Sequence, residues 1–154
     1  MRSTLTPRRA TLLIAAGVVA LDQITKVWAS SALADGPVVL VRGVLALQLN
    51  TNTGAAFGFF RGGGSLIAIA AIVAVVLILR ISADSVGVLE VTGLGLILGG
   101  AIGNLADRVT RGDGLLDGAV VDWIQLPNFP TFNVADAAIT IGAVLLILGA
   151  LRKS

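Results

Sequence analysis

The sequence contains no histidine and no cysteine, and only 13% of its 154 residues are charged. Without histidine and cysteine, the chain cannot build a Ser–His catalytic triad, a reactive thiolate or a zinc site made of these ligands. It also cannot form a disulfide bond. If the chain hydrolyses a covalent bond, carboxylates are therefore the first candidates for the chemistry.

The shortage of charge also limits the class of protein. Soluble domains usually carry about 25% charged residues, whereas this chain is 56% hydrophobic and has a mean hydropathy of +0.95. So little polar surface favours an integral membrane protein over a soluble globule. The net charge is only +2, and no basic tract is interleaved with aromatic residues, so we expect no nucleic acid partner.

Four apolar stretches predict four transmembrane helices in a mainly α-helical, polytopic membrane protein with a single membrane domain, residues 1–154. Each stretch approaches the roughly 20 residues that cross a bilayer once its flanks are included. All four prolines lie outside these stretches. The predicted spans cover approximately residues 10–29, 65–80, 90–106 and 135–151.

Three arginines among the first nine residues set the expected orientation. Basic residues favour the cytoplasmic side, and the first helix usually dominates the orientation, so we expect both termini in the cytoplasm. Segments 30–64 and 107–134 are then extracytoplasmic. The basic start also resembles a cleavable signal peptide, but its apolar run ends too far before the small residues around Ala34. We therefore expect an uncleaved first span.

Both extracytoplasmic segments contain short stretches typical of β-strands. Residues 37–50, PVVLVRGVLALQLN, are rich in β-branched residues and are interrupted by Gly43, which suggests a hairpin. Residues 119–125, AVVDWIQ, are a further strand candidate. We therefore expect a small β-sheet at the membrane surface.

Asp122 and Asp136 bracket the segment before the last span, and Asp136 opens that span. One interpretation is structural: Asn133 caps the helix and Asp136 occupies its first turn, where negative charge is favourable, while Asp122 faces water. The other is that the two carboxylates act together as a catalytic pair. The spacing alone leaves both interpretations open.

Polar residues also occur on the first and third spans. Asp22 and Lys26 are spaced as an i,i+4 pair, which either neutralises itself or braces the outward segment against the helix end. Asn104, Asp107 and Arg108 share one helix face. They form either a charge cluster at a helix end or a group that orients a peptide backbone or a carboxylate.

Asn52 and Gly54 belong to the stretch NTGAAFG, residues 52–58, in which small residues follow one another. Such a stretch is typical of a tight turn before the next span. It could equally expose its backbone to an extended substrate.

Taken in order, these motifs resemble the successive conserved boxes of the lipoprotein signal peptidases, the type II signal peptidase family. The resemblance extends over the whole chain and includes the number of spans and the two outward segments. The motifs that carry it are LDQITK (21–26), NTGAAFG (52–58), GGAIGNLADR (99–108), VVDW (120–123) and FNVAD (132–136).

The resemblance implies an aspartic endopeptidase of the bacterial plasma membrane. Such an enzyme cuts the signal peptide from a prolipoprotein just before the cysteine that carries diacylglycerol. The family's catalytic pair corresponds to Asp122 and Asp136, and Trp123 departs from the more usual phenylalanine. The implied fold has four membrane helices and a small extracytoplasmic sheet that cradles the substrate. The implied supporting or substrate-binding residues are Asp22, Lys26, Asn52, Gly54, Asn104, Asp107, Arg108 and Asn133.

From the resemblance we expect no cofactor and no metal. The expected partners are a diacylglyceryl prolipoprotein and membrane lipids, and the expected state is a monomer with its active site near the extracytoplasmic face. Two other classes fit the composition: a small ion-coupled transporter, in which acids would line a polar path through the membrane, and a four-span scaffold, in which Asn133 and Asp136 are only caps.

Overall fold

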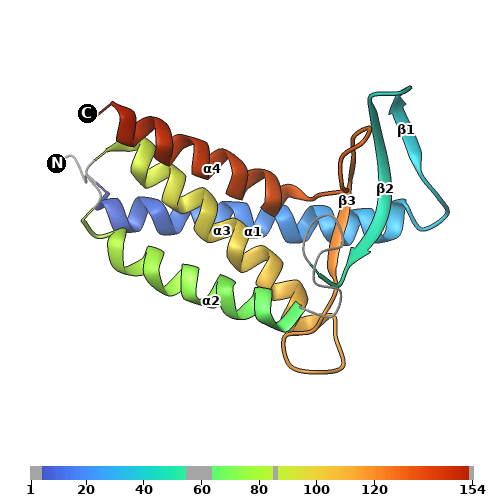
Figure 1. The fold of residues 1–154 in the computed structure, drawn as a ribbon, viewed down its shortest axis with the longest axis horizontal. Helices are drawn as coiled ribbons and strands as arrows, with labels where there is room; N and C mark the ends of the chain where they lie inside the picture. Colours follow the sequence, from blue (N-terminus) through green and yellow to red (C-terminus); the bar gives the residue numbers. More distant parts are fainter. Residues whose placement is uncertain (1–4, 55–63, 85–86, 153–154) are drawn as a thin grey trace.

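The computed structural model describes residues 5–54, 64–84 and 87–152, in which four helices form a bundle and a small sheet crosses one end of it (Figure 1). The start of α1 and the end of α4 lie together at the opposite end. The helices are α1 (Pro7–Ala32), α2 (Gly64–Ile81), α3 (Val88–Thr110) and α4 (Val134–Leu151), and the strands are β1 (Val38–Val41), β2 (Leu45–Asn52) and β3 (Val120–Gln125).

All four of these helices are long and apolar enough to cross a membrane, with 26, 18, 23 and 18 residues in chain order. At 1.5 Å per residue, even an 18-residue helix covers most of the roughly 30 Å hydrocarbon layer. Their outer faces carry large exposed apolar side chains, such as Leu66, Ile69 and Val73 of α2. The predicted fold class, four transmembrane helices with a small sheet, is confirmed.

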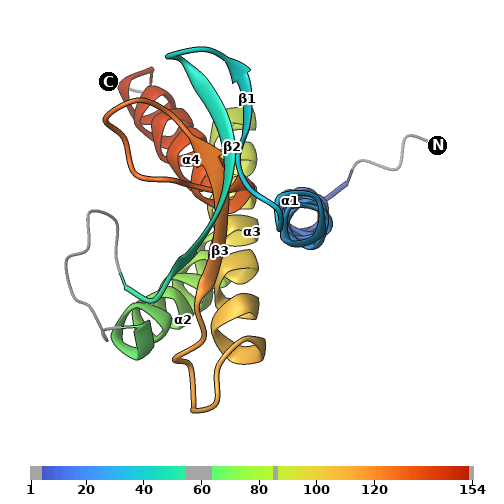
Figure 2. The same ribbon diagram turned by 90° about the vertical axis from the view of Figure 1, so that its right-hand side faces the viewer.

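Helix α3 lies at the centre of the bundle, with α1 on one side of it and α2 and α4 on the other (Figure 2). Its glycines allow this close packing. A methyl group on Gly99 would lie 2.6 Å from Cβ of Val18 and 2.7 Å from the carbonyl oxygen of Ala15, both on α1. The recurring glycines of α3 therefore serve helix–helix contact.

The three strands form one antiparallel sheet in the order β1-β2-β3. β1 and β2 make a hairpin whose turn contains Gly43 at φ +73°, a left-handed conformation that favours glycine. β2 pairs with β3 so that Asn50 lies opposite Asp122. After β3 the chain turns back, and Phe132 forms a bridge with Ile124. This return brings the start of α4 next to β3.

Candidate active site

Asp122 and Asp136 approach the same polar site from different elements. Asp122 lies on β3 and is 1% exposed, and Asp136 lies half-buried in the first turn of α4. Asn133 connects them: its side-chain Nδ2 donates to Oδ1 of Asp122 at 2.7 Å, and its backbone N–H donates to Oδ2 of Asp136 at 3.2 Å. One residue thus holds a carboxylate oxygen of each aspartate.

Asn133 is also the cap of α4. Its Oδ1 accepts the backbone N–H of Asp136 at 2.9 Å, and Asp136 returns a bond to the backbone of Asn133, which completes a capping box. The capping interpretation from the sequence is therefore correct as geometry. It does not compete with the pairing of the two acids, because the free Nδ2 group of the same cap reaches Asp122.

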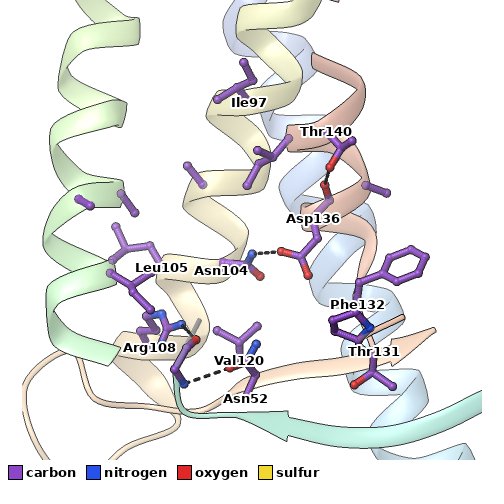
Figure 3. A pocket seen from close by; sticks show the side chains of 18 of the residues that line it. Asn52, Ile97, Asn104, Leu105, Arg108, Val120, Thr131, Phe132, Asp136 and Thr140 are labelled. Carbon is purple, nitrogen blue, oxygen red and sulfur yellow. Dashed lines mark hydrogen bonds between the residues drawn. The ribbon is translucent and has the colours of Figure 1, made fainter. Parts of the chain in front are cut away.

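Asn104 on α3 is the second side chain that links the site (Figure 3). Its Nδ2 donates to Oδ1 of Asp136 at 2.8 Å. Its Oδ1 accepts from Nζ of Lys26 at 3.0 Å and from Nδ2 of Asn133 at 3.1 Å. An amide side chain inside an apolar helix needs such partners, because burying it without a hydrogen bond would cost about 2–7 kcal/mol.

A further wall of the site is made of Asn52, Gly54 and Arg108. Nδ2 of Asn52 donates to Oδ2 of Asp122 at 3.3 Å, and Oδ1 of Asn52 accepts the backbone N–H of Gly54 at 3.0 Å. Arg108 is 4% exposed, and its Nη2 donates to the carbonyl oxygen of Gly54 at 3.1 Å. Its buried Nη1 has no hydrogen-bond partner within the described residues.

Behind these residues lies a buried ionic cluster. Nζ of Lys26 is 2.8 Å from Oδ2 of Asp22 and 2.8 Å from Oδ2 of Asp107, and all three side chains are 0% exposed. Arg111 completes the cluster, with its Nε 3.0 Å from Oδ1 of Asp107. The i,i+4 spacing of Asp107 and Arg111 could have identified Arg111 from the sequence. Gln23, which donates to Asp22 at 3.1 Å, was also missed and carries no clear sequence signal.

All ten residues named from the sequence thus belong to one connected network of hydrogen bonds and ion pairs. It runs from Asp22 through Lys26 and Asn104 to the two aspartates, and from there to the wall that contains Arg108. The structure brings these residues together. In the described parts of the chain, no group of three or more acidic side chains has the arrangement of a metal site.

The environment of Asp122 changes its chemistry. Burial, followed by the negative charge of Asp136, raises the pKa of Asp122 to about 7, against the lowering effect of the hydrogen bonds from Asn52 and Asn133. A carboxyl group with a pKa near 7 can hold a proton at neutral pH and also release it. Such a group is suited to proton transfer.

A cavity of about 860 Å³ opens beside this network, between α2, α3 and α4 (Figure 3). Asp136, Asn104, Arg108 and Asn52 line its polar end. Asp122 is not a lining residue, so Asp136 is the aspartate that faces the cavity directly. The rest of the wall is apolar and includes Ala70, Ala71, Ala74, Ile97, Ala101 and Ile141. The cavity therefore joins an apolar channel between helices to a pair of carboxylates.

Comparison with known proteins shows which family this sequence resembles. A sequence profile described as "Signal peptidase (SPase) II" matches residues 14–152. The chain is similar to the Lipoprotein signal peptidase of Rhodococcus jostii (strain RHA1), with 41% identity over 143 residues, which cover 92% of this chain and 72% of that protein. The corresponding protein of Mycobacterium avium (strain 104) is 42% identical over 145 residues, 92% of this chain and 80% of the other.

The fold also has a solved counterpart, a bacterial membrane enzyme determined by the in meso method at 2.3 Å resolution. The two superpose with a TM-score of 0.82 and 29% sequence identity, over 92% of this chain and 87% of the other. The sequence matches therefore give the family, and the solved structure shows that the fold is that of a bacterial membrane enzyme.

Proposed function

This chain belongs to the signal peptidase II family and is a peptide-bond hydrolase of the bacterial membrane, and we propose that it removes signal peptides from diacylglyceryl-modified prolipoproteins by cutting just before the lipidated cysteine. Membership in this family sets aside the transporter and scaffold interpretations. The observation that carries the proposed chemistry is the bridge that Asn133 makes between Asp122 and Asp136.

In the proposed mechanism the two aspartates share one proton, because two adjacent carboxylates do not both ionise at low cost. The ionised member takes a proton from water while the water oxygen attacks the scissile carbonyl carbon. The protonated member donates its proton to the carbonyl oxygen. When the tetrahedral intermediate collapses, the C–N bond breaks and the leaving nitrogen takes a proton from the pair. One hydroxyl of the intermediate returns its proton to the pair and becomes the carbonyl of the product, so the pair again holds one shared proton. These roles belong to the pair and are not assigned to either aspartate alone.

The charges around the site support a single negative charge on the pair. Arg108 lies close enough to Asp122 and Asp136 to interact electrostatically with both. One positive charge then faces one negative charge. The neighbouring cluster is neutral by itself, with two acids and two cations: Asp22, Asp107, Lys26 and Arg111. Two ionised aspartates would leave an uncompensated buried charge, which is strongly unfavourable.

Nη1 of Arg108, which has no hydrogen-bond partner among the described residues, is suited to the backbone recognition that cleavage needs. A buried guanidinium donor without a partner costs free energy until a carbonyl oxygen accepts from it. We propose that a carbonyl of the extended substrate fills this position and that Asn52 helps to hold the same segment. The apolar cavity receives the hydrophobic part of the substrate, so that the scissile bond lies at the level of Asp136.

We further propose that the sheet and the aspartate pair face outward and that both termini are cytoplasmic. Arg8, Arg9, Arg80 and Arg152 lie at the ends of helices away from the sheet (Figure 1), and basic residues favour the cytoplasmic side. The site needs groups from α1, α3, α4 and the sheet of a single chain, which supports a monomer surrounded by lipid.

The test is cleavage of a synthetic diacylglyceryl prolipoprotein peptide by purified Asp122→Asn and Asp136→Asn variants in lipid. Each variant should insert normally and lose about 100- to 10,000-fold in rate, the range for a lost acid–base group. Asp35→Asn is the matched control, because Asp35 is exposed. Normal cleavage by either variant would refute the pair. Mass spectrometry of the product should find lipidated cysteine at its new N-terminus, and any other terminus would refute the cut site.

A further inference from the structure

Asp22, Lys26 and Asp107, here called the clamp, lie behind the aspartate pair and make no hydrogen bond to either aspartate side chain within the described residues. We propose that the clamp sets the spacing and orientation of Asp122 and Asp136, with Lys26 as a positioning residue for the reaction. The inference rests on the proposed two-aspartate function and explains how the pair is held.

Each acid of the clamp holds the peptide group just before one aspartate. Oδ2 of Asp107 accepts the backbone N–H of Val121 at 3.1 Å, one residue before Asp122. Oδ1 of Asp22 accepts the backbone N–H of Ala135 at 3.0 Å, one residue before Asp136. The two elements that carry the pair, β3 and α4, are thus each fixed to a clamp acid next to the functional residue.

Lys26 connects the two clamp acids. Its Nζ lies 2.8 Å from each acid, so the ammonium fixes the distance between Asp22 and Asp107. Both acids also accept hydrogen bonds from backbone N–H groups, Asp107 from β3 and Asp22 from α4. The distance between the two acids therefore also sets the distance between β3 and α4. A packing contact between apolar side chains would tolerate more displacement, since it has no directional bonds.

The third N–H of Lys26 orients Asn104. An ammonium can only donate hydrogen bonds, so the atom of Asn104 that lies 3.0 Å from Nζ must be Oδ1. Nδ2 of Asn133 donates to the same oxygen. Nδ2 of Asn104 therefore has to point the other way, where it meets Asp136. A flipped amide would place its N–H₂ against two donors and its oxygen against a carboxylate.

The helices are shaped to admit this cluster. A methyl group on Gly103 would lie 2.6 Å from Oδ2 of Asp22, so α3 leaves room for the carboxylate only because it has glycine there. Stability alone gives little reason for such a cluster, since well-packed apolar residues often replace a buried ion pair without loss, and sometimes with a gain of about 1–4 kcal/mol. Positioning Asp122 and Asp136 gives a functional explanation for these buried charges.

The decisive variant is the charge-balanced double substitution Lys26→Met with Asp22→Asn. It removes one cation and one anion, keeps the pair of Asp107 and Arg111, and leaves an amide oxygen at position 22 for the N–H of Ala135. We expect kcat to fall about 10- to 100-fold, as for a small misplacement of reacting groups. KM and the melting temperature should stay near wild type, because the cavity and Arg108 are unchanged.

The pH–rate profile separates geometry from charge. Burial raises the pKa of Asp122, and the positive charge of Lys26 opposes that rise. The single variant Lys26→Met should therefore move the profile to higher pH. The double variant loses a positive and a negative charge together, so its kcat should fall at every pH while the profile keeps its position.

Wild-type kcat in the double variant would overturn the proposal, and so would a loss of activity that matches the loss of folded protein. If the double variant does not fold, Asp107→Asn decides in its place: it removes the negative charge that pairs with Lys26 and Arg111, and kcat should fall, whereas unchanged kcat overturns the proposal. Arg80→Gln, at the other end of the bundle, is the control. Asp122→Asn and Asp136→Asn are assayed in parallel, and normal cleavage by them would refute the aspartate pair independently of the clamp.

Discussion

Replacing Asp122 with asparagine should make the folded chain less sensitive to pH, even though it removes activity. Burial, followed by the charge of Asp136, raises the pKa of Asp122 from an ordinary 3.8 to about 7. Its side chain is almost completely buried, at 1% exposure. Asparagine has nearly the same shape and does not ionise, so the substitution removes the titration. It also loses one of the two hydrogen bonds from Asn52 and Asn133, a cost that is the same at every pH.

The sign follows from proton linkage. Because the pKa of Asp122 is higher in the folded chain, the folded state keeps its proton at a pH where the unfolded state has lost it. The resulting stabilisation is complete below pH 3.8 and is lost as the pH rises to about 7. At about 1.4 kcal/mol per pH unit, a gap of about three units corresponds to about 4 kcal/mol.

The assay is reversible unfolding in neutral detergent micelles between pH 4 and 8, followed by tryptophan fluorescence. Trp28 and Trp123 report on the site, because their rings meet edge to face at 5.6 Å and Trp123 follows Asp122 in the chain. Across this range the wild type should lose about 4 kcal/mol more than Asp122→Asn. The control Asp35→Asn should follow the wild type. Parallel curves for wild type and Asp122→Asn would refute the argument that burial controls this carboxyl.

Three further predictions concern the surroundings of the pair. Gly103→Ala should push Asp22 out of place and lower kcat about tenfold, whereas Gly17→Ala, which has open space around it, should match the wild type in the same assay. Arg108→Lys keeps the charge but loses the planar donors, of which one binds Gly54 and another is proposed to bind a substrate carbonyl. Steady-state kinetics should therefore give a KM raised about tenfold, and an unchanged KM would contradict this. EDTA should leave the cleavage rate unchanged, since the proposed chemistry uses carboxylates and water, and chelator inhibition reversed by added zinc would disprove it.

The spans and the sheet could be predicted because they depend on local patterns. Apolar runs free of proline predict membrane helices, and the β-branched stretch around Gly43 predicts a hairpin. Helix α1 continues through Asp22 and Lys26 to Ala32, since Lys26 finds buried partners on α3 and Asp22 pairs with Lys26 and accepts a backbone N–H of α4. Composition alone would have made the two residues candidates for the end of the helix.

The connections within the site could not be predicted in the same way. Lys26 and Asn104 are 78 residues apart, and no local pattern relates an ammonium on one helix to an amide on another. The sequence also presented capping and catalysis as alternatives for Asn133 and Asp136, whereas the folded chain uses the same side chains for the cap and for the link to Asp122. Only the return of the chain at Phe132 makes both possible.

The spacing of Asp22 and Lys26 also matters during biosynthesis. Helix α1 is made first, and Asn104 lies 78 residues after Lys26, which takes roughly 4 to 16 s at about 5–20 residues per second. During that interval neither Asp107 nor Asn104 exists to receive the ammonium. The i,i+4 contact of Asp22 and Lys26 lies within one helix, so the nascent segment can enter the bilayer as a neutral ion pair and exchange lipid for α3 when that helix arrives.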